Sequence, residues 1–185
     1  SFEIADLPLI RYIASKKKPI LISTGMASLE EVGEAIESAK IAGNTNIALF
    51  HCISSYPAPV SDANLNSITL LKKEFGVQVG LSDHTIDNAA AIASIALGAC
   101  VIEKHVTLDR KGGGADDSFS IEPNELKDLV IQSKEAFSSI GKPAFMPTKS
   151  ESLVLKNRRS LYVVKNLKKG EEIRKENIRS IRPGN

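Results

Sequence analysis

The chain contains three histidines, and each one lies at or just after the end of a segment that is predicted to be a buried strand. These residues are His51, His84 and His105. In parallel α/β architectures the C-terminal edge of the sheet is where active sites form. Two imidazoles together with carboxylates and waters suit a borderline divalent ion such as Mn²⁺. The placement predicts a metal-assisted site, while the alternative for any single histidine is a satisfied core or loop residue.

Hydroxyl and charged residues accompany the histidines at the same strand ends. Such groups cost free energy on burial unless they meet a polar ligand or each other, so they are candidates for substrate binding. Capping of the following helix is the favoured interpretation for Thr24, Ser28 and Thr85, and the loop from Tyr56 to Pro59 is interpreted as turn geometry. The polar residues at the strand ends are Ser23, Thr24, Ser54, Ser82, Asp83, Glu103 and Lys104.

Strand and helix patterns alternate along the first two thirds of the chain. Mostly apolar runs, typical of strands buried on both faces, occupy residues 19–23, 46–51, 77–82 and 100–105. Helix patterns occupy residues 28–42, 64–75, 87–97 and 123–140, with a shorter one near residues 8–15. This alternation predicts an α/β fold, either a doubly wound sheet or half of a (β/α)8 barrel. No GxGxxG sequence follows a strand, which argues against a dinucleotide site.

The pattern changes after Gly141. Residues 142–157 contain two prolines and no periodicity, so they are predicted to be a linker. Residues 158–185 begin with a strand pattern over 160–164, followed by a turn and a further extended segment. The predicted organisation is an α/β unit over residues 1–141, a linker over 142–157 and the first part of a small β-rich domain over 158–185, too short to fold alone.

Composition excludes several classes of protein. The 185 residues carry 24 Lys and Arg against 22 Asp and Glu, too small an excess of positive charge for a nucleic-acid-binding surface. No apolar run approaches the roughly 18 residues of a membrane span. Cys52 and Cys100 lie in apolar segments without CxxC spacing, which favours a reducing compartment. We therefore expect a cytoplasmic protein without nucleic-acid or membrane partners. Its first residue is Ser1, so we also expect a piece of a longer polypeptide.

Several motifs, in this order, resemble the sialic-acid synthase family. They are PILISTGM over 19–26, FHCIS over 50–54 with Tyr56-Pro57, GLSDHT over 80–85, IEKHVT over 102–107 and IRPGN over 181–185. Enzymes of that family condense phosphoenolpyruvate with an N-acylated amino-sugar aldehyde and release phosphate. They pair a (β/α)8 TIM barrel with a small antifreeze-like (SAF) domain and work as domain-swapped homodimers. The resemblance implies the second half of the barrel, with residues 1–3 ending its fourth strand, and then part of the SAF domain.

The resemblance also implies roles for individual residues. His84 and His105 match the metal ligands, with Mn²⁺ expected and Mg²⁺ or Co²⁺ as alternatives. His51 lies in a family motif, but no ligand role carries over to it. The family's phosphoenolpyruvate-binding residues match Ser1, Ser23, Ser54, Ser82 and Arg182, the arginine reaching across the dimer. Its sugar-contacting acids match Glu3, Glu103 and Asp116.

The details over residues 113–120, 158–164 and 178–184 are similar to the pseudaminic-acid synthase branch, which uses a 2,4-diacetamido-trideoxy hexose. The alternative is an N-acetylneuraminate synthase that uses N-acetylmannosamine. The family's phosphate-binding lysines lie upstream of Ser1, so this chain alone is expected to be inactive.

Strand alternation bears on the chemistry. Glu103 lies two residues before His105, so both side chains are expected on one side of the strand, where Glu103 could orient a sugar or move a proton. The Nε2 atoms of His84 and His105 are expected within about 4–5 Å of each other, as two ligands of one ion. Lys104 is expected to point away, which argues against a Schiff-base aldolase. The remaining rival is a non-enzymatic carbohydrate- or ice-binding protein.

Overall fold

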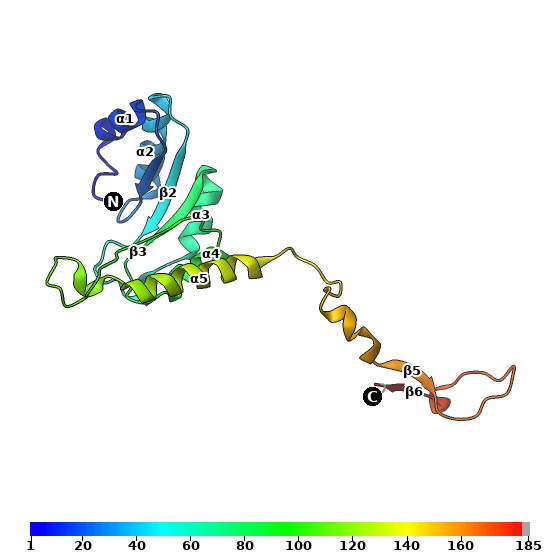
Figure 1. Ribbon diagram of the computed structural model, residues 1–185. Coiled ribbons are helices and arrows are strands. Elements are labelled where there is room, and N and C mark those ends of the chain that lie inside the picture. The colour runs from blue at the N-terminus through cyan, green and yellow to red at the C-terminus, as the bar shows by residue number, and fades with distance from the viewer. Residues whose placement is uncertain (183–185) are drawn as a thin grey trace. The chain divides into compact units, whose positions relative to one another are not determined.

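The computed structural model describes residues 1–182 of the chain (Figure 1). Contacts divide the chain into two units, Ser1–Gly141 and Lys142–Asn185. Pro183, Gly184 and Asn185 lie outside the described residues, and with them the end of the IRPGN motif. Within residues 1–182, no helix combines the length and the apolar character needed to cross a membrane.

The first unit is built on one parallel sheet with the strand order β1-β2-β3-β4. A doubly wound sheet reverses its strand order at a switch point, whereas a barrel adds each strand beside the last, so this order favours the half-barrel. The strands are β1 (Ile20–Ser23), β2 (Ile47–Cys52), β3 (Gln78–Asp83) and β4 (Ile102–Lys104). The helices are α1 (Leu7–Ser15), α2 (Leu29–Ile41), α3 (Asn66–Phe75), α4 (Ala89–Ala96) and α5 (Pro123–Ile140).

Local sequence signals explain where the helices begin. The Ser28 hydroxyl accepts from the Glu31 amide at 3.2 Å, and the Glu31 carboxylate accepts from the Ser28 amide at 2.7 Å, so the predicted capping box of α2 is confirmed. Pro123 opens α5, as predicted. The capping predictions for the two threonines are wrong. The Thr24 hydroxyl donates to the Phe50 carbonyl at 3.0 Å, and that of Thr85 donates to the Asp87 carbonyl at 3.2 Å.

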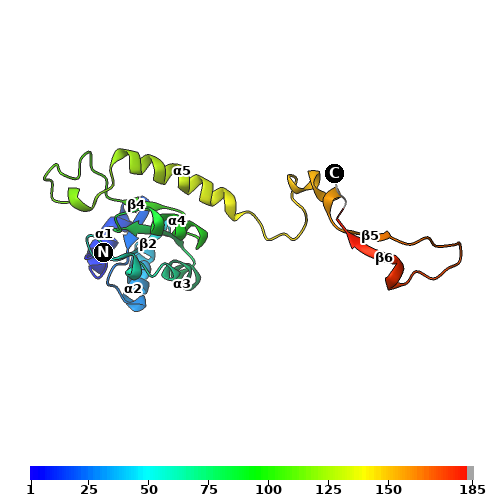
Figure 2. The same cartoon turned by 90° about the horizontal axis from the view of Figure 1, so that it is seen from below.

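Alternation along the strands gives the sheet two different faces. One face packs against the helices and forms the main hydrophobic core, to which β1, β2 and β3 contribute Ile22, Leu49 and Val79. A second, smaller cluster joins α4, α5 and β4 through residues such as Ala91 and Leu129; Figure 2 shows α4 and α5 side by side. The opposite face of β1 is open, and Leu21 is 58% exposed. The polar residues predicted to do chemistry are divided between these two faces.

The described chain begins with a turn. Residues 1–3 were expected to end a strand of the barrel. The Ile4 amide donates to the Ser1 carbonyl at 3.2 Å, and the Asp6 amide donates to the Glu3 carbonyl at 3.0 Å. Residues 2–5 thus form a turn, with the Ile4 and Asp6 amides bonded locally, and the place of residues 1–3 at the end of a barrel strand stays a prediction.

The second unit contains an antiparallel pair of strands, β5 (Ser160–Val163) and β6 (Ile178–Ile181). A single 3₁₀ turn, Lys175–Asn177, precedes β6, and two more, Glu151–Leu153 and Leu155–Asn157, precede β5. Apolar side chains on β5 are exposed, Leu161 by 72% and Val163 by 57%. A two-stranded ribbon with such exposure has too little core to be stable alone.

Candidate functional site

The candidate site begins with a serine and a glutamate on neighbouring strands. Ser82 on β3 is in register with Glu103 on β4, so both side chains lie on the face of the sheet that the helices leave open. The Ser82 hydroxyl donates to the Glu103 carboxylate at 2.7 Å. Cys52 on β2 is also in register with Ser82 and extends this row. The sequence analysis placed Ser82 and Glu103 at strand ends, and the structure brings them into contact.

The imidazoles of His84 and His105 lie just beyond this row, with ring centroids 5.3 Å apart. The Nδ1 atom of His84 lies 2.7 Å from the Ile53 carbonyl, which can only accept, so this nitrogen carries the proton. The Nδ1 atom of His105 lies 3.4 Å from the Asp116 carboxylate. In His84 the bond at Nδ1 leaves Nε2 as the free lone pair, which is how proteins orient metal-binding imidazoles.

This donor set fits a divalent ion that keeps water ligands. A ring centroid lies about 3.2 Å from an ion bound at about 2.1 Å, so two centroids 5.3 Å apart can share one ion. No group of three or more His, Cys, Asp or Glu side chains arranged for an ion occurs in residues 1–182. The ion would therefore have two protein ligands here. The separation of the two Nε2 atoms stays a prediction.

Two aromatic side chains enclose the imidazoles. The Tyr56 ring lies 4.1 Å from the His84 ring and 5.7 Å from the His105 ring, measured between centroids. The Phe119 ring lies 5.2 Å from that of His105. Burial raises the pKa of Tyr56, and the negative charges of Cys52, Asp116 and Glu103 add to this shift. The sequence analysis missed Phe119 as a site residue, and it interpreted the Tyr56 loop only as a turn.

Two of the predicted serines meet beside Cys52 and Gly25. The Cys52 sulfur lies 3.4 Å from the Ser1 hydroxyl and 3.9 Å from the Ser54 hydroxyl. A Cβ atom on Gly25 would lie 2.2 Å from the Ser54 Oγ and 2.8 Å from the Ser1 Oγ. Only glycine therefore lets both hydroxyls approach the loop between β1 and α2. Ser23 ends β1, in register with Phe50.

The Cys52 thiol and the His84 imidazole influence each other's protonation. Burial alone would raise the pKa of Cys52, but hydrogen bonds with His84, Ser1 and Ser54 outweigh it and lower the pKa to about 7. Burial likewise opposes protonation of His84, but hydrogen bonds to Cys52 and to the Ile53 carbonyl outweigh it and raise its pKa. The sequence analysis used Cys52 only as evidence about the redox compartment. The sequence did hold a signal for Cys52. It follows His51 by one residue on a predicted strand, so alternation places the two side chains on opposite faces of the sheet.

The loop between β4 and α5 brings Asp116 to His105. The neighbouring Asp117 carboxylate accepts from the Thr107 hydroxyl at 2.6 Å and from the Gly114 amide at 2.7 Å, and these bonds lower the pKa of Asp117. Arg110 donates to the Ser120 carbonyl at 2.8 Å and pairs with Glu125 on α5. Asp117 and Arg110 thus hold the loop at both ends.

His51 does not belong with the other two histidines. It is in register with Leu81, which places it on the helix-facing side of the sheet. Its Nε2 atom lies 2.7 Å from the Ala63 carbonyl, and the residue is only 7% exposed. The alternative of a satisfied core or loop residue therefore describes His51, which anchors the loop after β2.

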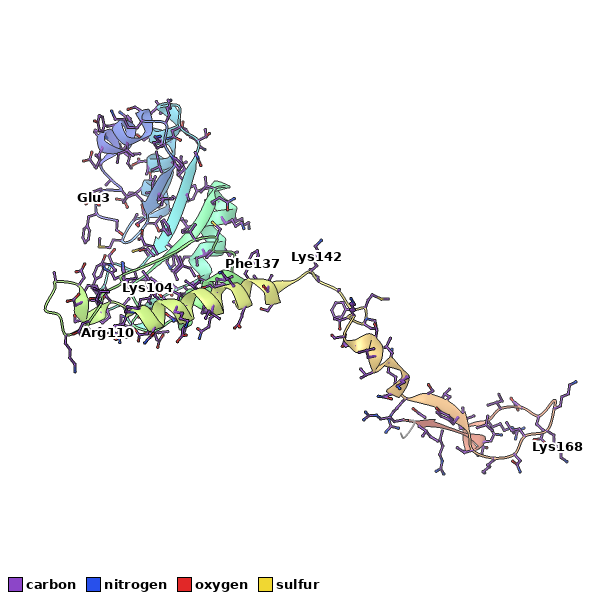
Figure 3. All side chains as sticks on the ribbon, viewed as in Figure 1. Glu3, Lys104, Arg110, Phe137, Lys142 and Lys168 are labelled. Atoms are coloured by element: carbon purple, nitrogen blue, oxygen red, sulfur yellow. The ribbon has the colours of Figure 1, made fainter. Side chains whose placement is uncertain are left out.

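Glu3 and Arg182 are two further predicted site residues. Glu3 lies in the N-terminal turn with its side chain 70% exposed (Figure 3). Arg182 directly follows β6 in the second unit and is exposed. Their roles stay predictions.

Lys104 points to the helix side of the sheet, as alternation predicted. Its ammonium lies 2.7 Å from the Asp83 carboxylate, with both side chains almost fully buried. A Schiff-base lysine needs a free amine facing the substrate, so this contact argues against the aldolase alternative.

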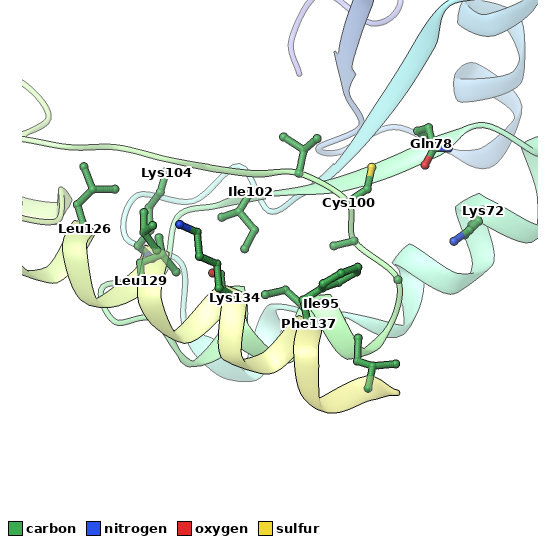
Figure 4. Close-up of a pocket in the computed structure, with 16 residues that line it drawn as sticks. Lys72, Gln78, Ile95, Cys100, Ile102, Lys104, Leu126, Leu129, Lys134 and Phe137 are labelled. Carbon is green, nitrogen blue, oxygen red and sulfur yellow. The ribbon is translucent and has the colours of Figure 1, made fainter. Parts of the chain in front are cut away.

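A large groove of the first unit lies elsewhere. It has a volume of about 870 Å³, lies between α5 and the segment that leads into β4, and is lined by apolar residues such as Ile102, Leu129 and Phe137 (Figure 4). Neither His84 nor His105 lines it. Because the polar groups converge at the strand ends and not in this groove, we place the candidate site at the strand ends.

Comparison with known proteins gives consistent matches. The NeuB family matches residues 1–144. A pseudaminic acid synthase of Campylobacter jejuni is 41% identical over 186 residues, covering 99% of this chain and 53% of its own length. An N,N'-diacetyllegionaminic acid synthase of the same species is 42% identical over 188 residues, covering 100% of this chain and 56% of its own.

A solved structure of the N-acetylneuraminic acid (sialic acid) synthetase from Leptospira borgpetersenii matches with a TM-score of 0.76 and 33% identity. The match covers 83% of this chain and 54% of that one. The predicted half-barrel is confirmed, and the chain spans about half the length of the relatives it matches.

Proposed function

The chain belongs to the NeuB family, and from that premise we propose that the full-length protein is a phosphoenolpyruvate-dependent nonulosonic acid synthase. In this reaction C3 of phosphoenolpyruvate attacks the aldehyde carbon of an N-acylated amino sugar. Water adds at C2, and phosphate leaves by cleavage of its C–O bond. The observation that supports this most directly is the pair of oriented imidazoles beside the Ser82–Glu103 contact.

The two imidazoles are the proposed metal ligands. His84 and His105 would hold Mn²⁺, or alternatively Mg²⁺ or Co²⁺, through Nε2, because the Nδ1 atom of His84 is bonded to the Ile53 carbonyl and that of His105 lies 3.4 Å from the Asp116 carboxylate. When bound, the ion supplies Lewis-acid polarisation of the aldehyde oxygen. Glu103 lies on the same face as His105 and is proposed to orient the sugar and to move a proton at that oxygen.

Hydroxyl donors and one arginine are proposed to bind phosphoenolpyruvate. Ser1 and Ser54 meet beside Gly25, and Ser82 lies on the same open face. Their O–H groups, together with that of Ser23, would donate to the carboxylate and phosphate oxygens. Arg182 would complete the site of the partner subunit in a domain-swapped homodimer, offering a bidentate contact. Glu3 and Asp116 would contact the sugar.

The proposed sugar is a 2,4-diacetamido-trideoxy hexose, and the product is then pseudaminic acid. The motifs that support this choice lie over residues 113–120 and 158–164. The alternative substrate is N-acetylmannosamine. A non-enzymatic carbohydrate-binding protein is the alternative of a different class, and it would bind the sugar without consuming phosphoenolpyruvate.

The test is phosphate release by the full-length protein. We expect release that requires phosphoenolpyruvate and the diacetamido sugar together, stops with a chelator and returns with Mn²⁺. His84→Asn should abolish release, whereas Lys127→Met, on the exposed face of α5, should leave it intact. Phosphate release with phosphoenolpyruvate and N-acetylmannosamine, but not with the diacetamido sugar, would select the alternative substrate. Binding of the sugar without phosphate release would refute a synthase.

A further inference from the structure

The structure assigns to Lys104 the role of a positioning residue that sets the geometry of His84 and His105. Its ammonium donates to three acceptors: the Asp83 carboxylate at 2.7 Å, the Thr85 carbonyl at 2.7 Å and the Asp87 carbonyl at 2.8 Å. An ammonium has three N–H groups, so all of its donors are used. We call this set of three bonds the Lys104 clamp.

The clamp joins the two strand ends that carry the imidazoles. Asp83, the last residue of β3, immediately precedes His84, and Lys104, the last residue of β4, immediately precedes His105. Asp83 and Lys104 are also in register across the sheet. A bond between these side chains therefore fixes the relative position of the residue that follows each strand, and those two residues are the proposed metal ligands.

The clamp also fixes the backbone on the far side of His84. Two of its three acceptors are carbonyls of the loop that follows β3, at Thr85 and Asp87. The second oxygen of the Asp83 carboxylate accepts from the Thr85 amide at 2.9 Å. His84 is thus held from both sides, while the Ile53 carbonyl orients its ring.

Burial makes this arrangement rigid. The side chains of Lys104 and Asp83 are 3% and 2% exposed, so water cannot replace the bonds between them. Removing one partner from such a pair strands a buried charge, but replacing both with neutral residues is often tolerated. Replacing both partners can therefore remove the clamp without the large loss of stability that a single replacement causes.

This inference rests on the proposed function for its biological meaning, but its test measures metal binding and imidazole state. The proteins are full-length wild type, Lys104→Met, and the double variant Asp83→Asn/Lys104→Met, which leaves no buried charge. Leu71→Ala, in the core of α3, is a destabilised control with an intact clamp, and Lys127→Met is a control for charge. Mn²⁺ affinity is measured by electron paramagnetic resonance, and thermal stability is measured on the same samples.

We expect the double variant to recover stability relative to Lys104→Met and still to bind Mn²⁺ roughly 10- to 100-fold more weakly than wild type. Leu71→Ala should lose stability and keep its Mn²⁺ affinity. Affinity of the double variant within about twofold of wild type would overturn the inference. So would an equal loss of affinity in Leu71→Ala, because the effect would then follow from instability alone.

A second measurement keeps the inference separate from the proposed function. In metal-free protein, ¹⁵N spectra of the imidazoles should show protonated Nδ1 on His84, and the double variant should lose this tautomer preference. Wild type that binds Mn²⁺ but releases no phosphate would refute the proposed synthase and leave the clamp standing. If wild type bound no Mn²⁺, the metal role would fail, and unchanged spectra in the double variant would then overturn the clamp.

Discussion

Replacing Gly25 with alanine is predicted to impair binding of phosphoenolpyruvate without unfolding the protein. The backbone of Gly25 is outside the left-handed region, so alanine can adopt it and the effect is purely steric. The added Cβ would lie 2.2 Å from the Ser54 Oγ and 2.8 Å from the Ser1 Oγ, where ordinary contact begins at 3.4 Å. The Ser54 hydroxyl must therefore move by more than an ångström.

The expected effect on binding exceeds the effect on stability. A hydrogen bond to a charged group contributes about 1.5–3 kcal/mol, so losing one hydroxyl donor should raise the KM for phosphoenolpyruvate roughly 10- to 150-fold. The displaced atom ends a short side chain that can rotate, so the cost in unfolding free energy should be near the lower end of the usual overpacking range, about 1 kcal/mol.

A matched glycine in the same unit provides the control. Gly33 lies inside α2, and a Cβ there would meet its nearest atom, the Phe75 Cε1, at an ordinary 3.5 Å. Gly33→Ala should raise the unfolding free energy by about 0.5–1 kcal/mol, because alanine loses less backbone entropy in a helix. Its KM for phosphoenolpyruvate should equal that of wild type.

The assay is steady-state phosphate release by full-length protein, with each substrate varied in turn, and urea unfolding of the same samples. An unchanged KM for phosphoenolpyruvate in folded Gly25→Ala would refute the assignment of these hydroxyls. A rise confined to the sugar KM would show that Ser1 and Ser54 face the sugar instead.

Three further predictions concern other parts of the structure. His51→Ala should lower the unfolding free energy by about 1–3 kcal/mol, through the lost bond to a buried carbonyl, and leave Mn²⁺ affinity unchanged, whereas His84→Ala should abolish it. The hydrogen bond from Arg110 depresses the pKa of Glu125 below its usual 4.5, so the stability it adds is present above that pH and lost as the pH falls. Glu125→Gln should therefore weaken the pH dependence of the unfolding free energy, measured with urea, below about pH 5, and an unchanged pH dependence would contradict the contact. Mixing inactive Arg182→Ala and His84→Ala chains should recover about a quarter of wild-type activity if Arg182 serves its partner's barrel; no recovery in proven heterodimers would place it in its own.

Most of the fold followed from local patterns. The apolar runs, the capping box at Ser28 and the proline at residue 123 predicted the strands and helices of the first unit to within a few residues. The N-terminal turn could not be predicted in this way, because a strand exists only where a partner accepts its hydrogen bonds. The Ile4 and Asp6 amides find partners within their own turn.

The site was predictable only where strand geometry determines it. The contact between Ser82 and Glu103 follows from their positions at the ends of neighbouring parallel strands. Phe119 reaches the imidazoles from the long loop after β4, and no periodicity links a loop residue to a strand. Its contact arises from tertiary packing, and the same is true of the approach of Ser1 to Cys52.

The position of His51 is instructive, because the rule that separates it from His84 and His105 was already in the sequence. Side chains alternate between the two faces of a strand. A residue near a strand end therefore belongs to the site only if its side chain lies on the open face of the sheet. Cys52, Ser82 and Glu103 share a register row on the open face, whereas His51 belongs to the adjacent row with Leu81. The same alternation places Asp83 and Lys104 on the helix side, next to the residues that are proposed to do the chemistry. One row thus presents reactive groups, and the row beside it holds their strands in position.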